Sequence, residues 1–366
     1  MAKYIYHLFL LCTLLLSSCQ SVEQFSIDYM LPAEVSFPSA LKRVAVVNNM
    51  PGGTDSRPIH EENNGNAEEM EIARTTRYYY GNAQIATESL AEAIADENYF
   101  DEVVICDSAL QTGYVTSEEA VLSTEEVNEL TQRLDVDFLI ALENVQLKAV
   151  EKVEYDPMYN AYLGTIDLNV YPTVRVYLPR RKGPMVSLTG NDSIYWEAYG
   201  GSVAHVRSRL ISDSNLVKEA SEFAGSVSTK QLLPYWKTAT RYYFSGGSVN
   251  MRDAAIFVRE NNWEKAIEQW KLAYQAKAKG KPKMCAAYNL ALGYEMQDSI
   301  GEALEWIKKA EDLAMEIDKV NEKKSTKGEV DAADVPNYVM TRIYATELER
   351  RRGEVSLLNM QMERFE

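Results

Sequence analysis

The spacing of apolar residues changes once along this chain of 366 residues, and that change constrains the fold more than any other feature. Between Ile166 and Leu178, apolar and polar side chains alternate, which is typical of a half-buried strand in an antiparallel sheet. Towards the C-terminus, apolar residues recur at helical spacing instead. We therefore expect an α+β domain over residues 41–245, followed by an all-α domain over residues 249–366.

Short β-branched runs precede the alternating segment and predict an α/β layer, in the order strand, helix, strand, helix, strand. Ser123 and Glu126 form a capping box at the start of the second helix, because each side chain can bond the other's backbone N–H group. Pro172 lies within the alternating run and lacks an N–H group, so we expect an edge position or a bulge there. The predicted strands cover residues 41–47, 103–106 and 138–142, and the first helix covers residues 83–98.

Two segments lack a regular period. Residues 19–40 are polar at first and then interrupted by Pro32 and Pro38, which predicts a tether. Residues 50–82 predict a long exposed loop, with a short helix between Glu68 and Arg77.

The first 18 residues have the layout of an export signal: a basic residue, an apolar run and two small residues before Cys19. The apolar run is shorter than the roughly 20 residues that a spanning helix needs. The sequence Leu16-Ser17-Ser18-Cys19 resembles a bacterial lipobox, and the resemblance implies acyl chains on Cys19. We therefore expect an outer-membrane lipoprotein of the cell envelope, facing the periplasm.

The overall charge limits the partners of the chain. Asp and Glu number 54 and Lys and Arg 38, a net charge of −16. Nucleic acid binding needs a basic stripe that displaces counterions from phosphates, and no such excess exists here. Attachment to a membrane is therefore expected from the lipid, and the remaining partner is expected to be a protein.

Small and aromatic residues recur at matching offsets in the C-terminal part, at a distance of 37 residues. Small residues let antiparallel helices approach closely, and this spacing resembles the tetratricopeptide repeat. The alternative is a generic pair of helical hairpins. Residues 335–351 predict a helix that caps the open end. The residues expected to pack the repeats are Ala254, Phe257, Ala266, Trp270, Ala273, Ala291, Tyr294, Ala303, Ile307 and Ala310.

A looser resemblance covers residues 41–235. The capped helix after Ser123, the acidic turn before Phe138, the buried strand and a meander that carries Trp196 resemble the α/β domain of TolB amino-terminal and curli-secretion-lipoprotein type. With the lipobox and the repeats, the whole chain resembles uncharacterised envelope lipoproteins. The resemblance implies a non-enzymatic role in envelope assembly or transport.

Catalytic and metal-binding signatures are missing from the sequence. His60 and His205 stand far apart, no cysteine pair has metal-ligand spacing, and there is no phosphate-binding loop. We expect no cofactor and no enzyme activity, although a carboxylate pair of a hydrolase remains a third possibility among so many acids.

Two functional hypotheses stand ahead of that one. The first is a scaffold that binds a partner protein through the helical repeats. The second is a surface-exposed binder of glycans or peptides, in which rings of Tyr78 to Tyr80 stack on the ligand. The alternative for those rings is that they hold the loop against the sheet.

Overall fold

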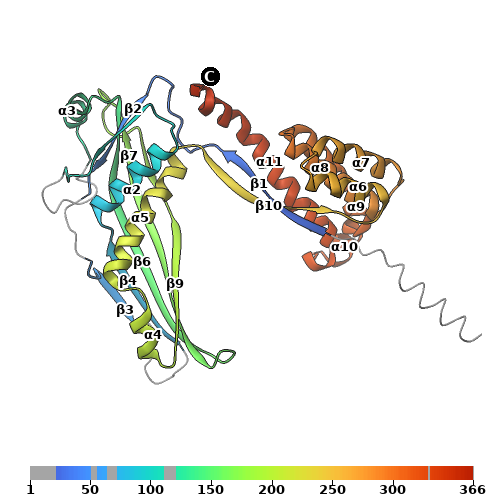
Figure 1. The fold of residues 1–366 in the computed structure, drawn as a ribbon, viewed down its shortest axis with the longest axis horizontal. Helices are drawn as coiled ribbons and strands as arrows, with labels where there is room; N and C mark the ends of the chain where they lie inside the picture. Colours follow the sequence, from blue (N-terminus) through green and yellow to red (C-terminus); the bar gives the residue numbers. More distant parts are fainter. Residues whose placement is uncertain (1–21, 51–55, 64–71, 111–120, 329, 366) are drawn as a thin grey trace, which may run out of the picture. The chain divides into compact units, whose positions relative to one another are not determined.

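The computed structural model describes residues 22–50, 56–63, 72–110, 121–328 and 330–365. The chain forms two compact units (Figure 1). One, the sheet unit, comprises Ala33–Tyr235 and Gln361–Glu366, and the other, the helical unit, comprises the residues up to Pro32 and Trp236–Met360. The expected fold class, an α+β region followed by a helical region, is confirmed.

The sheet unit contains one eight-stranded sheet. Its strands are β2 (Arg43–Asn48), β3 (His60–Asn63), β4 (Ile72–Tyr80), β5 (Glu102–Cys106), β6 (Phe138–Asp156), β7 (Ala161–Tyr177), β8 (Val186–Thr189) and β9 (Asp192–Gly200). Strand β6 organises the sheet, because it pairs with antiparallel β7 along one edge and with parallel β2 and then antiparallel β4 along the other.

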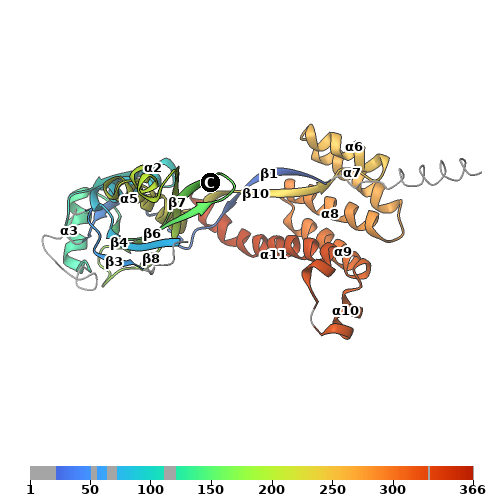
Figure 2. The same ribbon diagram turned by 90° about the horizontal axis from the view of Figure 1, so that it is seen from below.

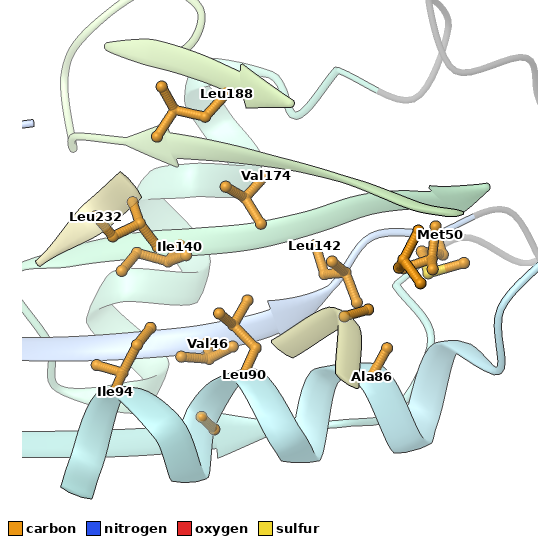
Figure 3. Close-up of a cluster of buried hydrophobic side chains, with 14 of the residues drawn as sticks. Val46, Met50, Ala86, Leu90, Ile94, Ile140, Leu142, Val174, Leu188 and Leu232 are labelled. Atoms are coloured by element: carbon orange, nitrogen blue, oxygen red, sulfur yellow. The ribbon is translucent and has the colours of Figure 1, made fainter. Parts of the chain in front are cut away.

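Helices cover the two faces of this sheet unequally. They are α2 (Ala83–Asp96), α3 (Thr124–Leu134), α4 (Val203–Arg209) and α5 (Asp213–Leu232). Helices α2 and α5 pack together over the main core, where Leu90 and Ile94 point from α2 towards Val46 of β2 (Figure 3). On the opposite face, α3 packs its Val127 and Leu130 over the first part of β6. The predicted capping box of α3 is confirmed.

A bulge at Glu143 changes which residues of β6 face the main core. The register of β6 against β7 shifts between Leu142 and Asn144. Even-numbered residues face α2 and α5 before the shift, and odd-numbered residues such as Val145 face them after it. Pro172 lies opposite Val145 of β6. On its other side, β7 pairs with β9 before this proline and with β8 after it. The proline therefore stands at a break in the pairing beside a bulge, as predicted.

The prediction for residues 50–82 was wrong where the structure describes them. Strands β3 and β4 occupy this segment as an antiparallel pair at the edge of the sheet, and the residues from Ile72 to Arg77 form a strand and no helix. The inward-facing positions of β4 include polar residues, Thr75 and Arg77, that face the core side beside Glu151. Because these residues are polar, β4 lacks the apolar alternation that identifies a half-buried strand.

The helical unit contains α6 (Val249–Arg259), α7 (Trp263–Gln275), α8 (Lys281–Met296), α9 (Ile300–Ile317), α10 (Val320–Lys327), the 3₁₀ turn Ala332–Asp334 and α11 (Pro336–Met362). Successive helices from α6 to α9 pack against one another around a single core. Helix α11 includes the predicted capping segment and runs beyond it. Among the described residues, none of the helices combines the length and apolar character that crossing a bilayer requires.

The helical unit also contains a two-stranded ribbon, which corrects two predicted boundaries. Strands β1 (Val22–Leu31) and β10 (Tyr235–Phe244) run side by side in both views (Figure 2). The predicted tether over residues 19–40 is therefore a strand for half its length. Its odd-numbered side chains from Phe25 to Leu31 turn towards the helical unit because they are apolar. Strand β10 lies in the predicted sheet domain but packs with the helices.

Candidate functional site

A buried cluster of charges holds the ribbon on the helical unit. At its centre is Glu295 of α8, whose side chain is fully buried. Arg241 of β10 binds it in a bidentate pair, with Nε 2.9 Å from Oε2 and Nη2 2.8 Å from Oε1. Arg351 of α11 donates to the same carboxylate, and so does the hydroxyl of Tyr344 at 2.5 Å. Such charge-assisted bonds are about twice as strong as neutral ones, and they replace the water that the carboxylate lost on burial.

A second carboxylate completes the cluster. Glu347 of α11 accepts a bond from Arg241 at 3.0 Å and one from the hydroxyl of Tyr29 in β1 at 2.8 Å. The Tyr29 ring lies 4.1 Å from the guanidinium carbon of Arg351. Burial by itself would raise the pKa of Glu347, but the charge of Arg241 and the bond from Tyr29 outweigh it and lower that pKa. The cluster pairs two carboxylates with two guanidinium groups, so it is neutral.

The first residues of β1 are fixed by a separate set of contacts. Glu23 accepts bonds from the hydroxyl of Tyr243 and from Arg259, both at 2.7 Å, and the bond from Tyr243 is the main reason that the pKa of Glu23 is lowered. The ring of Phe25 lies 5.4 Å from that of Trp263. The strand that begins the described chain is therefore an integral part of the helical unit.

Two grooves open on either side of the cluster. The edge groove, with a volume of about 410 Å³, lies between residues Thr240 to Tyr242 of β10 and residues Pro336 to Glu347 of α11. The β1 groove, of about 340 Å³, lies between residues Ile27 to Pro32 of β1 and residues Arg351 to Asn359 of α11. Large side chains at their rims face solvent: Trp236 and Ile343 are each 64% exposed.

The residues predicted to pack the repeats come together in the core of the helical unit. Eight are buried there, and Phe257 and Tyr294 are half-buried against it. Sequence reasoning missed Gly293 of α8, where a side-chain carbon would lie 2.5 Å from Ile267 of α7. It also missed the charge cluster, whose members are spread between residues 29 and 351. The lipidation candidate, Cys19, lies outside the described residues.

The sheet unit has a polar cluster of its own at the carboxyl end of parallel strand β2, a place where α/β sheets often bind ligands. Glu143 at the bulge is almost fully buried and accepts bonds from Asn49 at 2.8 Å and from the hydroxyl of Tyr177 at 2.9 Å. Arg175 stands farther away, at 3.6 Å. Burial raises the pKa of Glu143 despite these bonds. Within the described residues, no three metal-binding side chains converge, here or elsewhere.

Comparison with family models found two matches in this chain. The family described as Domain of unknown function DUF8603 matches residues 41–244, more than half of the chain, and Domain of unknown function DUF6340 matches residues 252–350. The chain belongs to the DUF8603 family. Comparisons with curated proteins and with solved structures gave no match.

The charge cluster draws on both matched regions. Arg241 lies within the DUF8603 match, whereas Glu295, Tyr344 and Glu347 lie within the DUF6340 match. Tyr29 belongs to neither, because β1 precedes both. The site around the ribbon therefore combines residues of the two matched regions and of the N-terminal strand.

Proposed function

We propose that this DUF8603 protein is a lipid-anchored, non-enzymatic protein of the cell envelope that binds a partner protein at its helical unit. The observation that carries the proposal is the pair of open grooves flanking a ribbon that buried charges hold in place. Specific interfaces are centred on large apolar and aromatic anchors on a rigid support, and Trp236, Tyr242 and Ile343 are such side chains.

The lipobox resemblance adds a reason to assign this role to the helical unit. Only two residues separate Cys19 from Val22, where β1 begins. A chain spans at most about 3.6 Å per residue, so an anchor on Cys19 would keep the start of β1 within roughly 11 Å of the lipid attachment. The helical unit would thus work at the membrane surface, on the periplasmic side of the outer membrane. The likeness to TolB-type domains and tetratricopeptide repeats agrees with an assembly role.

Photo-cross-linking in intact cells tests the proposal. A photoreactive amino acid replaces Trp236 or Ile343 in the full-length chain, and a matched control replaces Leu272 of α7, which is 50% exposed but lines neither groove. We expect a discrete cross-linked protein from the two groove positions and none from the control. Equal cross-linking at all three positions, or none at the grooves, would contradict the proposal.

The anchor has its own test. Mass spectrometry of the mature protein should find acyl chains on Cys19, and a Cys19→Ala variant should leave the membrane fraction. An unacylated terminus would remove the membrane part of the proposal and leave the groove part standing.

One observation keeps glycan binding as a second candidate. Side chains alternate between the two faces of a strand, so Tyr78 and Tyr80 lie on the face of the sheet opposite α2 and α5. Their neighbours on β6 are Lys148 and Gln146. Tyr80 is 50% exposed, whereas Tyr79 points to the other face, is buried and bonds Asp213 at 3.0 Å. Retention of sugars by the wild type but not by Tyr80→Ala on a glycan array would support this candidate.

A further inference from the structure

The outer edge of β10 has hydrogen-bonding groups of the backbone that point away from β1. Phe244 shows the direction of this edge, because its N–H donates to Oδ1 of Asn289 at 2.9 Å and its carbonyl accepts from Nδ2 of Asn289 at 2.8 Å. Both bonds are buried. The amide of Asn289 thus pairs with Phe244 as a neighbouring strand would, with one donor and one acceptor.

The same edge continues past Asn289 without a partner strand. In a strand, the N–H and carbonyl of every second residue point to the same edge, so those of Tyr242 and Thr240 point where those of Phe244 do. In the described part of the chain, β10 pairs with β1 alone. The edge groove lies directly beside it, since Thr240, Arg241 and Tyr242 line that groove in succession.

The lining of the edge groove indicates what can fill it. Its far wall is the apolar side of α11, with Val339, Met340 and Ile343. The charged side chains in its lining, Arg241 and Glu347, pair with each other at 3.0 Å, so the groove presents no net charge. An uncharged apolar chain suits this lining, whereas a charged side chain would lose its water without gaining a partner.

We propose that the partner binds by strand addition: an extended, uncharged peptide segment pairs with the edge of β10 at Thr240 and Tyr242. Alternate apolar side chains of the segment enter the edge groove, and the others face solvent. Asn289 marks the end of the added strand. This inference rests on the proposed function, because it specifies how the helical unit holds its partner.

A second copy of the chain is a poorer occupant. Free strand edges can pair with each other, but each copy carries a net charge of −16, which lies on the sheet unit, and the repulsion between two sheet units opposes association of two copies. The side-chain amide of Asn289 also stops pairing at one end of the edge, which leaves a short segment suited to a peptide.

The test uses a displayed library of random twelve-residue peptides, selected against the full-length mature protein. We expect enriched peptides with apolar residues at every second position that bind wild type at least about tenfold more tightly than Ile343→Glu. The matched control is Leu357→Glu on the same helix, which is exposed but lines neither groove and should bind as wild type does. Selection that yields no peptide sensitive to Ile343→Glu would overturn the inference.

Strand pairing is then tested on an enriched peptide itself. Two versions of the peptide are compared, one N-methylated at its odd-numbered amides and one at its even-numbered amides. One version should bind at least about tenfold more weakly than the unmodified peptide and the other less than about threefold more weakly, because only one set of amides faces β10. Tyr242→Pro in the protein should weaken binding at least about tenfold, since it removes the edge N–H, and Tyr242→Thr should retain binding. Equal binding of the two methylated peptides would overturn strand addition, as would a dimer of the chain that Tyr242→Pro dissociates.

The two proposals fail differently. If a cross-linked partner is found at Ile343 but the Tyr242→Pro variant captures it equally well, the helical unit binds a protein by another mode. If no position in either groove yields a partner, the proposed function itself is wrong.

Discussion

The two units of this chain differ in net charge and in the partners of one central buried carboxylate. By sequence, the sheet unit contains 33 acidic and 17 basic residues, a net charge of −16, whereas the helical unit contains 21 of each and is neutral. In the helical unit, the buried Glu295 is paired with two guanidinium groups. In the sheet unit, the buried Glu143 is bonded mainly by neutral groups. The sheet unit has an ion-paired buried carboxylate as well, Glu151, which Arg77 and Arg207 bind at 3.1 and 2.8 Å. The comparison teaches that ion pairs fix the ribbon on the helical unit, while the carboxylate at the end of β2 in the sheet unit is held mainly by neutral partners.

The largest effect should come from removing the charge at the centre of each cluster. Glu295→Gln removes the carboxylate that Arg241 and Arg351 share. Glu347 is then the remaining carboxylate of the cluster, so we expect the helical unit to lose about 3–5 kcal/mol in its free energy of unfolding. Glu143→Gln keeps most of the bonds of its cluster, and the sheet unit should lose about 1 kcal/mol or less. Denaturant unfolding of both variants measures this. Equal losses would show that the two clusters do not differ as described.

A second comparison concerns close helix packing in the two units. A side-chain carbon at Gly225 of α5 would lie 2.5 Å from the backbone nitrogen of Leu90 in α2, and backbone cannot move aside easily. At Gly293 the nearest atom belongs to a movable side chain, that of Ile267. We expect Gly225→Ala to cost about 3 kcal/mol and Gly293→Ala about 1–2 kcal/mol. Thermal unfolding would contradict this account if the order were reversed.

The units should also respond oppositely to acid. The pKa values of Glu23 and Glu347 are lowered, so the stability they give the helical unit is present above about pH 4.5 and is lost as the pH falls through their folded pKa values. The pKa of Glu143 is raised, so the sheet unit gains stability as the pH falls from neutrality through that raised pKa.

Tryptophan fluorescence can follow this response. Trp196 is the one tryptophan of the sheet unit, and the other four belong to the helical unit by sequence. In Trp196→Phe, the fluorescence transition reports the helical unit and should move to lower denaturant concentration between pH 5 and pH 3. A Glu347→Gln variant should show a smaller shift over the same range. A transition that strengthens in acid would contradict the assigned pKa directions.

The smallest effect is expected from salt. Raising the ionic strength from 0.01 to 0.15 M shortens the Debye length from about 30 to about 8 Å, which weakens repulsion among exposed carboxylates. The sheet unit should gain less than about 1 kcal/mol and the neutral helical unit should change less still. Hydrogen exchange of peptides from each unit checks this prediction. A larger gain in the helical unit would contradict the charge comparison.

Sequence reasoning found the elements whose apolar pattern is complete. The strands at 138–142 and 166–178 and the capped helix after Ser123 were predicted because period and cap are local features. It missed β1, although Phe25, Ile27, Tyr29 and Leu31 alternate, because Pro32 and Pro38 suggested a tether. It missed β4 because the inward side of that strand is partly polar.

The candidate site was beyond the reach of local patterns for a different reason. Glu295 carries no local sign of burial, since its partners come from β10 and α11, 49 to 56 residues away in the sequence. Likewise, nothing around Asn289 indicates that its amide pairs with the backbone of Phe244. Small residues at helical spacing indicated how the helices pack, but the ribbon that lies on them depends on pairing between β1 near the start of the sequence and β10 far along it.

Amide hydrogen exchange of β10, resolved residue by residue by nuclear magnetic resonance, tests the central claim most directly. The claim is that buried charges hold this strand while the N–H groups of Thr240 and Tyr242 on its outer edge stay open to a peptide. The amides of Arg241 and Tyr243, which face β1, should exchange slowly, and those of Thr240 and Tyr242 should exchange rapidly until an edge-binding peptide protects them. Equal protection of all four amides in the free protein would contradict the account.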